Sequence, residues 1–370
     1  MSATPDLERL LAERARRQRL TPSTRLDDPD DHEALLETIR SLAPVAPRAF
    51  VFPGTPPQLA PRVGFDDLPA AEELRRRGAI VKGRFGRGLI GYVATEDLPL
   101  YAAVYRRPSD RLSPEARAVV ELIAVEGPLP RSEIMALTEI RGRRLSRALI
   151  ELQRCFVLTE LQYETEWDNA WTLLESEYPE VAGAPPRERA LDEVIARLLD
   201  CLAIATLEQL RDGSGLPLRD LRSSLGRLGA GGRAIESPIG GEAMWTGAAA
   251  AERAGTATQE PYVAVLQPSD PLVRAHRSEL KRRFGRSGVL AYVQIDGRFA
   301  GAALGRWGIA PFDVQDVLIE PPHDAQQATR EQIIVGLRVL YPPPRHHILR
   351  YLDQPLDDPG GGAGGLEQRG

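Results

Sequence analysis

The stretch from Ser113 to Leu161 constrains the fold most, because it carries helix, turn and strand signals in one fixed order. Ser113 followed by Pro114 is typical of a helix start, since the hydroxyl can cap the first turn and proline needs no N–H there. Apolar residues at helical spacing follow until Gly127, which predicts the end of this helix. We expect a short second helix over 131–137, a third over 141–153, and then a strand.

The predicted third helix places leucine and alanine on its inner face and arginines on its other faces. These arginines are Arg141, Arg143, Arg144 and Arg147. The order of elements is typical of a winged helix, in which the third helix contacts DNA and a strand pair forms the wing. The alternative is a three-helix packing module whose arginines are only solvated. We predict DNA contact from these four side chains.

Two other stretches repeat this pattern, so a tandem architecture is expected. Residues 32–93 combine helical spacing with a basic strand pair, and residues 188–246 indicate three helices followed by a hairpin. From Tyr262 onward strands dominate, and Asp296-Gly297 between two apolar runs predicts a tight hairpin. The predicted fold class is therefore α+β, mainly α, with tandem winged helix-turn-helix units and a C-terminal β-rich part.

At 370 residues the chain exceeds one typical domain, so several modules are expected. Changes of pattern predict N-terminal helices with a first winged-helix unit, two further units, a β-rich domain with its hairpin, and a glycine-rich tail that we expect to be disordered. Their predicted bounds are 1–105, 106–185, 186–258, 259–356 and 357–370.

The charge balance argues against DNA binding by bulk electrostatics. The formal net charge is −5 and the pI is about 5.7, so any nucleic-acid face must be local. Cys155 and Cys201 are the only cysteines, and neither has a Cys-x-x-Cys partner. We therefore predict no disulfide framework, no zinc or other metal site, and no cofactor.

Nothing in the sequence indicates a membrane protein. No apolar run approaches the length needed to cross a bilayer, and the opening residues MSATPDLERLL lack an apolar signal core. We therefore expect a cytoplasmic, nucleoid-associated protein that binds double-stranded DNA, does not contact the membrane, and is a monomer.

Several motifs stand in an order that resembles a known family. PRVGFDDLPAAEELRRRGAIVKGRFGRG begins at Pro61 and is followed by ATEDLPLY, and LQPSDPLVRAHRSELKRRFG and YVQIDGRFAGAAL come later. In this the sequence is similar to the AlkZ/YcaQ-type winged-helix DNA glycosylases, bacterial proteins that excise bulky N7-alkylated purines and unhook interstrand crosslinks. The resemblance covers most of the chain. It implies tandem winged helices and a β-rich part that form a concave, basic face around duplex DNA.

The resemblance also locates a catalytic motif. In active members a Gln-x-Gln or Gln-x-Asp motif precedes the Arg-x-Gly-Phe-Asp helix start and positions the water that attacks the sugar C1′. Counting back from Arg62 places Arg48-Ala49-Phe50 there. Arginine has no acceptor lone pair and phenylalanine has no polar atom, so we predict a degenerate motif at Arg48 and Phe50. Gln58 is the only nearby amide.

Further candidates lie outside that motif. Six prolines between Ala43 and Arg62 forbid a regular helix, so this segment should be a shaped loop able to hold a site. Asp270, in Ser-Asp-Pro, is either a catalytic carboxylate or an ordinary capping turn. Phosphate contacts are also predicted from the basic strand pair and the basic segment near residue 280, namely from Lys82, Arg84, Arg87, Arg282 and Arg283.

The predicted function is that of a DNA-binding protein of the winged-helix DNA glycosylase family, which recognises alkylated or crosslinked DNA. If the protein is active, it releases the base by cleaving the N-glycosidic bond, using residues other than the usual motif. The alternatives are a non-catalytic binder of damaged or deformed DNA and a transcriptional regulator. A regulator would be expected to carry a dimerisation helix, and the sequence does not indicate one.

Overall fold

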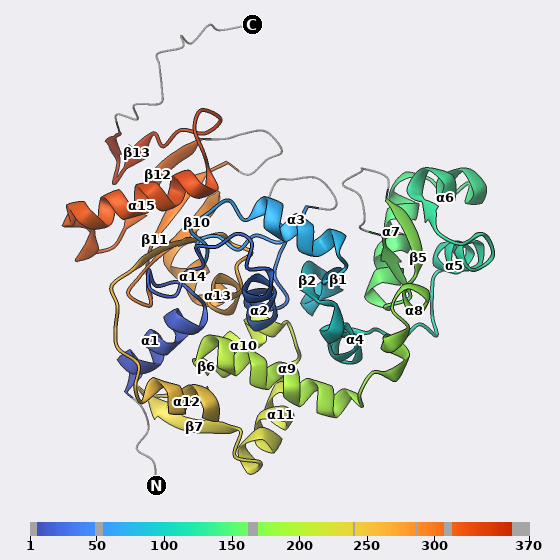
Figure 1. Cartoon of the computed structure of the whole chain (residues 1–370), viewed down its shortest axis with the longest axis horizontal. Helices are drawn as coiled ribbons and strands as arrows, with labels where there is room; N and C mark the ends of the chain where they lie inside the picture. Colours follow the sequence, from blue (N-terminus) through green and yellow to red (C-terminus); the bar gives the residue numbers. More distant parts are fainter. Residues whose placement is uncertain are drawn as a thin grey trace, which may run out of the picture.

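The computed structural model describes residues 6–48, 55–161, 169–239, 241–285, 288–306 and 313–356. Helices alternate with small antiparallel sheets along the chain, which confirms the α+β class. Residues 114–161 and 169–173 lie at one end of the molecule, and the C-terminal sheet with its covering helix lies at the opposite end (Figure 1). Phe50 and the predicted disordered tail fall outside the described residues.

The first part of the chain forms helices and one hairpin. These are α1 (Leu7–Arg17), α2 (His32–Leu42), α3 (Leu68–Arg76), β1 (Ile80–Phe85), η1 (Gly86–Gly88), β2 (Leu89–Ala94), η2 (Thr95–Asp97) and α4 (Leu98–Tyr105). Asp31 begins α2, because its carboxylate accepts a hydrogen bond of 2.9 Å from the Ala34 N–H. The described residues between α2 and α3 contain no helix. This agrees with the shaped loop expected from the six prolines between Ala43 and Arg62, with one helix on each side of it.

The central unit follows the predicted order closely. Its elements are α5 (Pro114–Glu126), β3 (Leu129–Pro130), α6 (Arg131–Thr138), α7 (Gly142–Arg154), β4 (Leu158–Glu160) and β5 (Ala170–Leu173). Ser113 caps α5 by accepting a hydrogen bond of 3.2 Å from the Ala116 N–H, and Gly127 ends it at a φ of +86°. The three strands form one sheet in the order β3-β5-β4.

The next unit repeats the order helix, strand, helix, helix, hairpin. After α8 (Leu174–Glu177) and η3 (Pro179–Gly183), its elements are α9 (Arg187–Leu202), β6 (Ile204–Thr206), α10 (Leu207–Ser214), α11 (Leu218–Ala230), β7 (Ala234–Ile239), β8 (Glu242–Gly247) and α12 (Ala248–Ala254). Thr206 and Gln209 cap α10 reciprocally with hydrogen bonds of 3.2 and 2.9 Å. The sheet order, β6-β8-β7, matches that of the central unit.

The C-terminal part is a four-stranded antiparallel sheet with helices. Its elements are β9 (Val263–Leu266), α13 (Pro271–Ala275), α14 (Arg277–Phe284), β10 (Val289–Ile295), β11 (Arg298–Gly305), β12 (Val314–Ile319), η4 (His323–Ala325), α15 (Gln327–Leu340), β13 (Arg350–Tyr351) and β14 (Gln354–Pro355). The sheet order is β12-β11-β10-β9. Asp296 and Gly297 turn between β10 and β11 at φ values of +47° and +85°, which is the geometry expected for an Asp-Gly hairpin.

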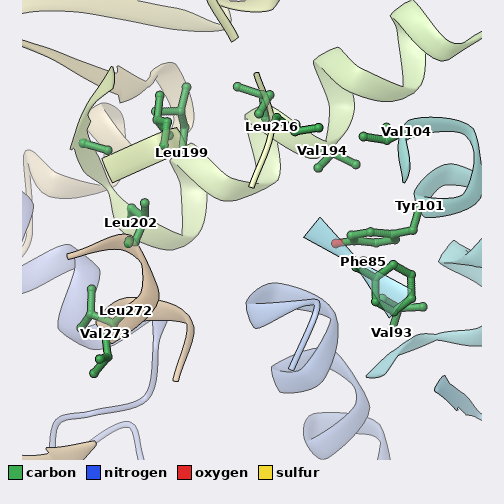
Figure 2. Close-up of a cluster of buried hydrophobic side chains, with 14 of the residues drawn as sticks. Phe85, Val93, Tyr101, Val104, Val194, Leu199, Leu202, Leu216, Leu272 and Val273 are labelled. Carbon is green, nitrogen blue, oxygen red and sulfur yellow. The ribbon is translucent and has the colours of Figure 1, made fainter. Parts of the chain in front are cut away.

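The largest hydrophobic core joins elements that are far apart in the sequence. Figure 2 shows the Phe85 and Tyr101 rings against each other, and the same cluster includes Val194 and Leu272. The Phe85 and Tyr101 rings meet edge to face, with centroids 5.6 Å apart. In contrast, among the described residues one separate core uses side chains from the range 112–173 and another uses side chains from the range 263–356. The two ends of the molecule therefore have their own cores, and the middle is shared.

No helix in the described ranges is long and apolar enough to cross a membrane.

Candidate active site and nucleic-acid interface

The proline-rich segment forms one wall of the candidate site. Its two arms, residues 45–48 and 55–58, run antiparallel and exchange backbone hydrogen bonds. Strand β2 holds the first arm, because Val45 and Tyr92 exchange backbone hydrogen bonds of 2.9 and 2.7 Å. Proline has no N–H and a fixed φ, so the arms keep isolated bridges instead of a continuous ladder. The segment is thus a shaped loop fixed to the first hairpin.

Arg48, at the predicted motif position, fixes this loop to α3. Its guanidinium pairs with the Asp67 carboxylate, whose side chain is 3% exposed, and lies 3.3 Å from Asp66. Asp67 also accepts the Leu59 N–H. The Arg48 side chain is therefore committed to contacts at the start of α3. Phe50, the other residue predicted at this motif, lies outside the described residues.

Arg62 and Asp270 form a buried ion pair across 208 sequence positions. Arg62 donates to the two Asp270 carboxylate oxygens at 2.6 and 3.2 Å, and the side chains are 1% and 7% exposed. Arg62 also donates to Gln18 Oε1 at 3.2 Å. Asp270 accepts the Leu272 N–H at 2.9 Å and so caps α13. Both carboxylate oxygens of Asp270 are thus already hydrogen-bonded within the chain.

A small cavity lies beside this ion pair, between the proline-rich loop and the turn that precedes α13. Its volume is about 10 Å³, and polar side chains from both segments line it, namely Gln58, Gln267, Ser269 and Asp270. The Oε1 atom of Gln58 is buried and has no hydrogen-bond partner among the described residues. Buried polar atoms normally have one, so this acceptor is available for a ligand or a water.

Sequence reasoning missed Gln267 and Ser269 as site residues. They belong to the LQPSDPL motif, which was interpreted only through Asp270 and its turn. The turn is present, since the Asp270 N–H donates to the Gln267 carbonyl at 3.0 Å. Only the fold shows that this turn lies against Gln58.

The outer face of α7 carries free positive charge. Arg141, Arg143 and Arg147 are exposed, and their side chains have no hydrogen bond or ion pair in the part of the chain that the structure describes. Arg144 is also exposed but pairs with Glu115 of α5 at 2.7 Å. Of the four arginines predicted to contact DNA from this helix and its N-cap, three are therefore exposed and unneutralised among the described residues.

The cations of the first hairpin, in contrast, bind other parts of the chain. Lys82 is buried, and its ammonium lies 2.6 Å from the Glu160 carboxylate on β4. Arg84 donates to Gln153 of α7 at 2.8 Å, and its partial burial lowers the pKa of its guanidinium. Both side chains thus join the hairpin to the central unit.

The remaining predicted cations also have acidic neighbours. Arg87 is 46% exposed and lies 3.5 Å from Asp212, and Arg282 is 68% exposed and lies 3.9 Å from Glu208. Arg283 pairs with two carboxylates, one of them on its own helix. The structure therefore does not gather all the predicted cations on one surface, and the free group is on α7.

Neither cysteine is placed as a nucleophile. Cys155 and Cys201 are both free and buried. Burial raises the pKa of the Cys201 thiol to about 12, so at neutral pH it stays protonated. Within the described ranges, no three His, Cys, Asp or Glu side chains gather in a way that could hold a metal ion.

Comparison with known proteins gives two findings. The family model described as DNA glycosylase AlkZ-like matches residues 58–304. Among solved structures, the chain is similar to the Streptomyces sahachiroi DNA glycosylase AlkZ, with a TM-score of 0.66 and 17% sequence identity over 95% of this chain and 100% of that chain. A search of curated proteins finds no match. The matched range includes Gln58, Arg62, α7 and Asp270.

Proposed function

The chain belongs to the AlkZ-like DNA glycosylase family, and from this premise we propose that it is a DNA-repair glycosylase that binds duplex DNA and cleaves the N-glycosidic bond of alkylated or crosslinked purines. It acts as a monomer in the cytoplasm, at the nucleoid. Tandem winged-helix units with the bounds expected from the sequence are part of this proposal, supported by the repeated element order in residues 114–173 and 187–247.

The free arginines of α7 are the observation that carries the DNA-binding part of the proposal. Arg143 and Arg147 are four positions apart, so they project from one side of the helix one turn from each other. Arg141 stands at the N-cap of the same helix. Unpaired guanidiniums bind phosphate oxygens strongly and in bidentate geometry. A chain with a net charge of −5 needs such a local surface to approach a polyanion.

Binding of a fluorescent duplex, measured by anisotropy at several salt concentrations, tests this surface. The double variant Arg143→Ala/Arg147→Ala removes two phosphate contacts, so the slope of log affinity against log salt should become shallower by about 1.8. The matched control Arg187→Ala/Arg298→Ala also removes two exposed arginines, each paired with a carboxylate on a different element. An unchanged slope in the α7 variant, or an equal change in the control, would refute the assignment of α7.

A second candidate function is that of a non-catalytic binder of damaged or deformed DNA, or a transcriptional regulator. It is favoured by the state of two of the three predicted catalytic positions, since Arg48 is engaged by Asp67 and Asp270 by Arg62. The two functions differ in base release from a duplex that carries N7-methylguanine or a crosslink analogue. Release by the wild type supports the glycosylase. Tight, salt-sensitive binding without release supports the binder.

A further inference from the structure

The cavity between the proline-rich loop and the turn before α13 has the size and chemistry of a site for a single water. Its volume of about 10 Å³ is near the lower limit for holding one water, roughly 10–15 Å³. A water also needs two to four polar partners. Gln58, Gln267 and Ser269 supply amide and hydroxyl groups at its lining, and the Gln58 Oε1 atom is a buried acceptor without a partner.

We propose that Gln58 and Gln267 together hold the water that hydrolyses the N-glycosidic bond, which makes this cavity the catalytic centre; the inference rests on the glycosylase function proposed above. Both residues line the cavity and are partly exposed, so the cavity lies close to the surface, from which a substrate sugar would approach. The substrate class is a nucleotide with a cationic N7-alkylated purine in duplex DNA.

The chemistry required of the site is modest. The C1′–N9 bond breaks with its electron pair passing to N9, so the cationic purine leaves as a neutral base. The water oxygen forms the new bond to C1′, and one water proton passes to solvent, carrying away the positive charge. An amide cannot take that proton at neutral pH, but its oxygen accepts one water O–H and so directs a lone pair toward C1′. The glutamines therefore orient the water and do not act as bases.

The neighbouring charged pair positions this centre. Arg62 lies four residues after Gln58, and Asp270 lies three residues after Gln267. Their buried ion pair joins the two segments that bring the glutamines together. Since both Asp270 oxygens accept hydrogen bonds from Arg62 and Leu272, this carboxylate is a positioning residue in the proposal.

Single-turnover release of N7-methylguanine from a duplex tests the inference, with duplex affinity measured on the same samples. Gln58→Ala and Gln267→Ala should each slow release by about 100-fold, because a misplaced nucleophile costs about that factor. Affinity for the duplex should stay within about twofold of the wild type. The double variant should be only slightly slower than either single one, since both residues hold the same water. Gln332→Ala, an exposed glutamine on α15, is the matched control and should behave as wild type.

Gln58→Glu separates orientation of the water from a merely structural role. The carboxylate keeps an acceptor oxygen and adds a base, so release should recover relative to Gln58→Ala and should rise with pH as the carboxyl group ionises. A structural role for Gln58 would give no such pH profile.

Each alternative outcome is decisive. If the wild type releases base and Gln58→Ala does so equally fast, the inference is overturned and the glycosylase function stands. If the wild type binds duplex but releases nothing, the catalytic centre is refuted together with the glycosylase activity, and only the DNA-binding part of the proposed function remains. If it neither binds nor releases, the proposed function fails as a whole.

Discussion

Replacing Asp270 by alanine should destabilise the whole molecule. The change leaves the Arg62 guanidinium, 1% exposed, without its counter-charge, and losing one partner of a buried pair costs about 3–5 kcal/mol. It also removes the cap on the Leu272 N–H, worth about 1 kcal/mol. Together the loss is about 4–6 kcal/mol, against roughly 5–15 kcal/mol for the total stability of typical proteins.

The measurement is urea-induced unfolding followed by circular dichroism. Asp270→Asn keeps a side-chain acceptor for Leu272 and should lose about 3–5 kcal/mol only, from the broken charge pair. The double variant Arg62→Met/Asp270→Leu removes both charges and should recover most of the loss. Asp110→Ala, at a carboxylate that is 70% exposed, is the control and should cost less than about 1 kcal/mol.

Two results would refute this reasoning. The first is a loss below about 1 kcal/mol for Asp270→Ala, and the second is a double variant no more stable than the single one. A variant that keeps full stability and affinity for DNA but loses all base release would instead make Asp270 a catalytic carboxylate.

Three further predictions follow from buried groups. Burial lowers the pKa of His276, so its contribution to stability is fully present above the unfolded pKa of about 6.5 and is lost as pH falls below it. The free energy of unfolding of the wild type should therefore drop between pH 7.5 and pH 5.5, and that of the His276→Gln variant should drop by less. An equal drop in the wild type and the variant would contradict this prediction. Lys82→Ala should cost about 3–5 kcal/mol in urea unfolding, because Glu160 loses its counter-charge, and the salt slope of DNA binding should stay unchanged; a shallower slope would make Lys82 a phosphate contact after all. Cys201, with its pKa raised to about 12, should resist a thiol reagent at pH 8 until urea unfolds the protein, and rapid labelling of the native protein would show that the site opens.

Local signals in the sequence predicted local structure well. Ser113 and Gly127 bound α5 as their chemistry indicates, and Asp296-Gly297 forms the expected hairpin turn. These features depend on hydrogen bonds between residues a few positions apart, so the sequence contains most of what determines them. The proline-rich segment was likewise predicted to be a shaped loop, because proline excludes helix without any tertiary information.

The candidate site was harder to predict, because its determinants are non-local. Lys82 was interpreted as a phosphate contact, and nothing near it in the sequence shows that Glu160 of β4 lies against its ammonium. Gln58 was noted without a second acceptor, since its companion Gln267 comes from a distant turn. The role of a charged or amide side chain depends on the groups around it in space. For Lys82 and Gln58 these groups come from distant parts of the chain, and only the fold identifies them.

The ion pair between Arg62 and Asp270 also determines when, during synthesis of the chain, the cavity beside it can form. The two residues are 208 positions apart. The segment with Gln58 therefore leaves the ribosome long before the segment with Gln267 has been synthesised. The central unit, whose core uses residues 112–173 only, can fold in the meantime and display α7. A chain arrested before residue 270 would therefore present the helix proposed to contact DNA without the proposed catalytic centre. On the proposed function, such a truncated product would bind duplex DNA through α7 without releasing a base, so premature termination of this chain would cost more than the loss of one active molecule.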